Sequence, residues 1–127
     1  MSKAKSIKNK QLDLDVNGFN IKSDLPKNWG GDNLYPDPLT LLQAALLSCA
    51  TTHAMLFTDK IGIDRAQVTL DLEPVFNENN EIIEATILVY VPANFPADKE
   101  TALTGAVHNC VVGRHVKFPR NVVVVKQ

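Results

Sequence analysis

The chain has 127 residues, of which 45% are hydrophobic and 21% are charged. These values are typical of a globular protein and exclude intrinsically disordered and collagen-like chains. Its length suits one domain, so we expect residues 1–127 to form a single one. Thirteen Lys and Arg against fourteen Asp and Glu leave a formal net charge of -1. A surface so evenly balanced argues against a groove for nucleic acid.

The N-terminus and the cysteine content indicate a cytoplasmic protein. Residues 1–10 contain four lysines and no continuous apolar run of the kind a secretory signal needs. We expect this start to be a solvated, frayed terminus. Two cysteines, Cys49 and Cys110, are too few for the framework of a small secreted domain, so we expect them to be thiols.

A β-hairpin is predicted near the start of the chain. Leu12, Leu14 and Val16 alternate with polar residues, and the alternation resumes after Asn17-Gly18. Asn-Gly is the preferred pair for a type I′ turn, which joins two antiparallel strands. Residues 23–37 follow as a loop rich in Pro, Gly, Asn and Asp.

A long helix is predicted over residues 38–60. Asp37 can act as N-cap, Pro38 suits the first helical position, and Gly62 can end the helix. Polar groups scattered through residues 39–57 argue against a membrane span and favour a buried helix. Because apolar residues lie on every side, the helix has to be enclosed, and one small domain cannot surround it. We therefore expect a homodimer that buries this helix against its partner.

The second half of the chain predicts a further hairpin, a helix and a strand. Residues 68–72 alternate in polarity, and after the polar turn of residues 77–80 the apolar positions Ile83 to Val91 recur on one face. Residues 97–109 are typical of a shorter helix, a further turn of helix is possible over residues 111–116, and residues 122–125 form an apolar final strand. This order predicts an α+β fold with antiparallel sheets.

The two cysteines allow three interpretations. Both can be core residues, since free cysteine is among the most buried residue types. They can form a redox pair, in which one thiolate is oxidised by a peroxide and the other thiol closes a disulfide. They can also bind zinc with His53 and His108, but neither familiar zinc spacing is present, so we expect neither a metal nor another cofactor.

Three segments carry a resemblance to a known family. Gly30-Gly31-Asp32-Asn33 and the run from Asp37 to Cys49 resemble the glycine loop and cysteine-bearing helix of the OsmC/Ohr family, the osmotically inducible and organic hydroperoxide resistance proteins. The segment from His108 to Val112 resembles that family's second cysteine segment. The likeness covers residues 29–127, and the order of the predicted elements agrees with it.

The resemblance implies an intertwined homodimer with active sites at the subunit interface. It implies that Cys49 is the peroxidatic cysteine and Cys110 the resolving one, in a protein that reduces organic hydroperoxides and is recycled by dithiols. Two positions depart from the catalytic members: Leu39 stands where they have a glutamate, and no arginine precedes Arg65. The missing arginine is the cation that favours the thiolate, so peroxidase activity is expected to be slow or absent unless another group replaces it.

Other side chains are candidates for that replacement, and a rival function stays open. His53, one helical turn from Cys49, can pair with that thiol, and Lys10 or Lys22 in the hairpin region can supply a positive charge. Arg114, four residues after Cys110, can support the second thiol. Alternatively the protein is a non-catalytic homologue that binds a small hydrophobic ligand at the dimer interface. Trp29, Tyr35 and Phe95 are the candidate pocket residues.

Overall fold

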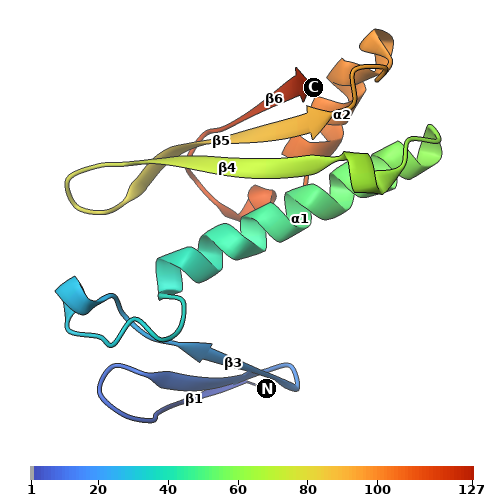
Figure 1. Cartoon of the computed structure of the whole chain (residues 1–127). Coiled ribbons are helices and arrows are strands. Elements are labelled where there is room, and N and C mark those ends of the chain that lie inside the picture. The colour runs from blue at the N-terminus through green and yellow to red at the C-terminus, as the bar shows by residue number, and fades with distance from the viewer. Residues whose placement is uncertain (1) are drawn as a thin grey trace. The chain divides into compact units, whose positions relative to one another are not determined.

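The computed structural model describes residues 2–127 and divides the chain into two compact units, residues 1–44 and residues 45–127 (Figure 1). The division falls inside the long helix α1 (Pro38–Lys60), whose bounds are those predicted from the sequence. The prediction that residues 1–127 form one domain stays a prediction.

The first unit contains a three-stranded antiparallel sheet in the order β1-β2-β3. Its strands are β1 (Ser2–Ser6), β2 (Leu12–Val16) and β3 (Phe19–Ser23). Asn17 and Gly18 have φ angles of 50° and 85°, which confirms the predicted turn between β2 and β3. The expected frayed terminus is wrong, because β1 pairs with β2 along its whole length.

The loop after β3 is organised around the buried carboxylate of Asp24. Backbone amides of Leu25, Leu34 and Asp32 donate to it at 2.7, 3.0 and 3.5 Å. Burial of Asp24 opposes ionisation, but these three donors outweigh it and hold the pKa of the carboxyl below its ordinary value. The loop also brings Gly31 so close to the backbone of Leu25 that a Cβ there would overlap the Leu25 carbonyl.

Helix α1 begins and ends as the sequence predicts. Asp37 precedes it, and its carboxylate accepts a hydrogen bond from the Thr40 hydroxyl. At the other end Gly62 has a φ of 76°, and the amide of Ile63 donates to the carbonyl of Thr58 at 3.0 Å. This bond spans the reversed last turn and satisfies a carbonyl that the helix itself leaves free.

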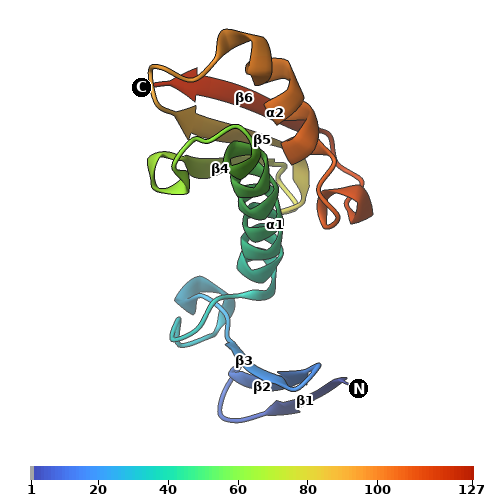
Figure 2. The same ribbon diagram turned by 90° about the vertical axis from the view of Figure 1, so that its right-hand side faces the viewer.

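The second unit contains a sheet in the order β4-β5-β6, with β4 (Thr69–Phe76), β5 (Ile82–Val91) and β6 (Arg120–Lys126). Strands β4 and β5 form the predicted hairpin. The expectation of antiparallel sheets is wrong for β6, which pairs with β5 in parallel from Ala85↔Arg120 onward. The chain crosses between them through α2 (Glu100–His108), as parallel neighbours require (Figure 2).

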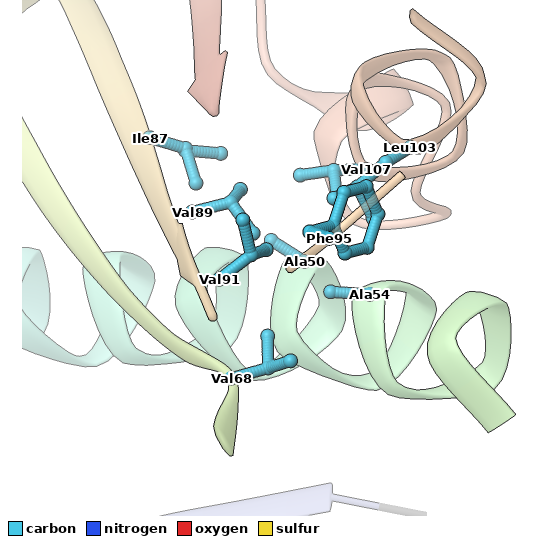
Figure 3. Packing of buried hydrophobic residues seen from close by; sticks show 9 residues of the cluster. All are labelled: Ala50, Ala54, Val68, Ile87, Val89, Val91, Phe95, Leu103 and Val107. Carbon is cyan, nitrogen blue, oxygen red and sulfur yellow. The ribbon is translucent and has the colours of Figure 1, made fainter. Parts of the chain in front are cut away.

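The core of the second unit lies between α1, the sheet and α2 (Figure 3). Strand β5 contributes Ile87, Val89 and Val91 to it, each completely buried. The remaining buried members come from α1, the start of β4, the loop after β5, and α2: they are Ala50, Ala54, Val68, Phe95, Leu103 and Val107. Small residues on α1 therefore allow the sheet to approach the helix closely.

Only one stripe of α1 is buried by the chain itself. It consists of Leu46, Ala50, Ala54 and Thr58, which recur at the spacing of one helical turn. Leu56, on another side, remains 53% exposed. By length and composition α1 could also cross a membrane, a property it shares with core helices of soluble proteins. The expected enclosure of this helix is not provided by a single chain.

Candidate thiol site

The structure brings the two cysteines together in the second unit. Cys49 lies in α1 and is half-buried, whereas Cys110 follows α2 and is completely buried. The two side chains lie 3.8 Å apart. Both cysteines are free thiols. A disulfide requires the sulfurs to approach to roughly 2.05 Å, so a small side-chain movement separates this arrangement from a bond.

Two neighbouring backbone amides donate hydrogen bonds to the two sulfurs. The amide of Val112 donates to Sγ of Cys49 at 3.5 Å, and that of Gly113 donates to Sγ of Cys110 at 3.3 Å. Both belong to a tight turn that continues into a short 3-10 helix at Gly113–His115. Because an amide hydrogen carries positive partial charge, the Gly113 donor acts to lower the pKa of the Cys110 thiol.

Opposing effects act on the Cys110 thiol. Its burial raises the pKa, which the Gly113 amide opposes, while the adjacent Cys49 raises the pKa further and the charge of Arg120 lowers it. The net direction is upward from the ordinary value of 9.0. Cys110 therefore needs its remaining favourable contacts in order to react as a thiolate at neutral pH.

Arg120 is the cation at this site, and sequence reasoning missed it. The first residue of β6, it donates from Nη1 to the carbonyl of His108 at 2.7 Å. A Cβ on Gly113 would overlap Nη1 and would lie 2.9 Å from Sγ of Cys110. The guanidinium and the sulfur thus lie against the same face of Gly113, where only a residue without a side chain fits.

The supporting residues expected from the sequence take other places. His53 is half-buried on α1, and the Arg114 side chain is exposed. Within residues 2–127 neither side chain makes a hydrogen bond or ion pair to a cysteine. Leu39, which replaces the expected glutamate, lies in the first turn of α1. The structure therefore shows no contact that would support a thiol-activating role for His53 or Arg114.

The three candidate pocket residues are not assembled in either unit. Trp29 and Tyr35 belong to the first unit, where Trp29 is 57% exposed. Phe95 belongs to the second unit and is a core residue, only 2% exposed (Figure 3). Its ring packs against other core side chains and leaves almost no surface for a ligand.

Two other features bear on what the site can bind. Between α2 and β6 lies an open depression of about 320 Å³ that contains neither cysteine. Its lining residues are Glu100, Thr101, Thr104, Val122, Val123 and Val124. Among residues 2–127, no group of three or more His, Cys, Asp or Glu side chains is arranged to hold a metal ion.

Comparison with known proteins gives matches in structure alone. No family model matches the chain, and no curated protein matches its sequence. A candidate osmotic stress induced and detoxification response protein from Psychrobacter arcticus has a TM-score of 0.83 at 18% identity, covering 98% of this chain and 94% of that one. The OsmC-like protein of Mycoplasma pneumoniae has a TM-score of 0.78 at 14% identity, covering 99% and 95%.

A third structure is an organic hydroperoxide resistance protein from Elizabethkingia anophelis, with a TM-score of 0.69 at 19% identity, covering 99% of this chain and 94% of that one. The architecture and the paired thiols define an α+β protein with two neighbouring free cysteines. Its fold is that of the OsmC and Ohr proteins, which confirms the fold that the sequence resemblance predicted.

Proposed function

We propose that this protein reduces organic hydroperoxides with Cys49 as the nucleophile and Cys110 as the resolving thiol. The observation that carries the proposal is the 3.8 Å separation of the two cysteine side chains. Cys49 is the more accessible of the two, whereas Cys110 is completely buried. This difference in exposure suits Cys49 to meet the peroxide and Cys110 to meet only Cys49.

The reaction proceeds in two steps. The Cys49 thiolate attacks the outer peroxide oxygen, the O–O bond breaks, and the alkoxide leaves as an alcohol after taking a proton, so that Cys49 becomes a sulfenic acid. The Cys110 thiolate then attacks the Cys49 sulfur, the S–O bond breaks, and hydroxide leaves as water after taking a proton. The pair is now a disulfide, and one peroxide has been reduced to one alcohol.

A dithiol completes the cycle by thiol-disulfide exchange. One of its thiolates attacks the Cys49–Cys110 disulfide, and its second thiol releases the protein as two free thiols while the reductant becomes a disulfide. The class of substrate is supported by the neighbours in structure, one of which is described as an organic hydroperoxide resistance protein.

We further propose that the protein is a homodimer in which α1 packs against a second copy. Only one stripe of this apolar helix is buried by its own chain, and Leu56 is among the exposed large side chains. A soluble helix that is apolar on several sides needs a partner, and a second copy offers the same surface. The additional burial would exclude water from around Cys49.

Stopped-flow consumption of cumene hydroperoxide by the reduced protein tests the enzymatic proposal. We expect rapid loss of one equivalent of peroxide by the native chain and no such phase for Cys49→Ser. Arg114→Gln is the matched control, because Arg114 is exposed and close to Cys110 in sequence, while among residues 2–127 its side chain makes no hydrogen bond to either thiol. Equal and negligible rates for native and Cys49→Ser protein would contradict the proposal and favour the ligand-binding alternative.

A further inference from the structure

The surroundings of Arg120 suggest a role beyond completing the end of α2. Its guanidinium donates to the carbonyl of His108, one of the carbonyls that a helix leaves free at its end. Within residues 2–127 no carboxylate forms an ion pair with Arg120. The positive charge is therefore not neutralised by an acidic side chain and remains available to a nearby anion.

The closest anion that can form there is the thiolate of Cys110. Both groups lie against the same face of Gly113, where a Cβ would meet the guanidinium and the sulfur together. The titratable and charged groups that face the Cys110 thiol are Cys49 from α1 and Arg120 from β6. Of these, only Arg120 favours the ionised form, because a second thiol or thiolate disfavours it.

We propose that Arg120 is a positioning residue for the resolving step: held against Gly113 by the carbonyl of His108, it stabilises the Cys110 thiolate that closes the disulfide. The inference rests on the proposed function for its biological meaning, because it assigns the cation to the second thiol of that reaction. It also explains how a chain with no arginine before Arg65 keeps a positive charge at its thiols.

The attack by Cys110 can be measured without any peroxide. Dithiobis(nitrobenzoate) reacts with the more exposed Cys49, forming a mixed disulfide and releasing one coloured thiolate. The Cys110 thiolate then attacks the Cys49 sulfur, the mixed S–S bond breaks, and a second coloured thiolate leaves as the Cys49–Cys110 disulfide forms. The rate of this second release reports the ionised fraction of Cys110, and Cys110→Ser should show only the first.

We expect Arg120→Gln to slow the second release about tenfold at pH 7 and to move its pH midpoint upward by about one unit. Arg120→Lys, which keeps the charge without the planar fork, should stay within about threefold of the native rate. Arg114→Gln should match the native protein. If the Gln and Lys variants are slowed equally, Arg120 acts only as a helix cap, and the proposal is wrong.

Two further outcomes are informative. If Arg120→Gln releases the second thiolate at the native rate, the charge has no part in the step, which overturns the proposal. If that variant does not fold, Arg120→Met provides the test, since it keeps an unbranched apolar stem and removes the charge; an unchanged rate again overturns the proposal. The native protein can also fail to reduce cumene hydroperoxide while Arg120→Gln still releases the second thiolate more slowly than Arg120→Lys. That result would refute the proposed function and leave the role of Arg120 standing.

Discussion

The backbone amide of Val112 donates to Sγ of Cys49 at 3.5 Å, although 63 positions of the sequence separate the two residues. This bond joins the turn after α2 to the middle of α1. It places the buried Cys110 next to Cys49, because both Val112 and Gly113 belong to the turn that begins at Cys110. The thiol site therefore exists only when the second unit is folded.

Replacing the resolving thiol should stop the reaction halfway. In Cys110→Ser we expect one equivalent of cumene hydroperoxide to be consumed, after which Cys49 remains a sulfenic acid that dimedone captures. The native protein should yield little adduct, because Cys110 closes the disulfide first. Mass spectrometry of the adduct checks this, and abundant adduct in the native protein would show that Cys110 does not resolve the intermediate.

A charge on the open side of α1 should disrupt the proposed dimer. Leu56→Lys places an ammonium group where a partner helix would pack, and we expect it to shift the sedimentation coefficient to that of a monomer. Val75→Lys is the matched control, since Val75 in β4 is 48% exposed, close to the 53% of Leu56. A native protein that already sediments as a monomer would contradict the dimer proposal.

Two glycine substitutions should change stability in opposite directions. Gly31→Ala forces a Cβ into the Leu25 carbonyl, so we expect a loss of about 1 to 3 kcal/mol in the free energy of unfolding. Gly105→Ala lies inside α2 with nothing within 4 Å, and should gain about 0.5 to 1 kcal/mol. Urea denaturation measures both. Equal effects would show that the loop is free to move away from the new methyl group.

The carboxylate of Asp24 should make stability depend on acid pH. Its pKa in the folded protein lies below the ordinary value of 3.8, so its contribution is complete above that pH and is lost as the pH falls through the folded value. Asp24→Asn should therefore flatten the decline in melting temperature below pH 4. If both proteins decline in parallel, other carboxylates cause the acid sensitivity.

Local rules of the sequence account for much of the fold. Asn17-Gly18 specifies its turn because both residues tolerate positive φ, and Asp37-Pro38 with Gly62 specifies both ends of α1. The alternation of polar and apolar residues predicts the hairpin of β4 and β5, which the structure confirms. Ile83, expected on the buried face, is 49% exposed because it lies before Ala85, where pairing with β6 begins.

Long-range arrangement accounts for what was missed. The parallel direction of β6 follows from the crossover through α2 and cannot be seen in a run of valines. Arg120 follows Pro119 at the start of that strand, and only the pairing of β6 with β5 brings it to Cys110. The resemblance implies that Cys49 and Cys110 act together, but only the structure shows that they lie close to each other.

The register between β5 and β6 also determines on which side of the sheet Arg120 lies. Arg120 lies on the same side of β6 as Val122 and Val124, which pack against the core. A slip of one residue would turn Arg120 to the opposite side and carry its guanidinium away from Gly113. Such a slip would also turn Val122 and Val124 away from the core, so the burial of these two valines, which fixes the register of β6, also fixes the position of the guanidinium.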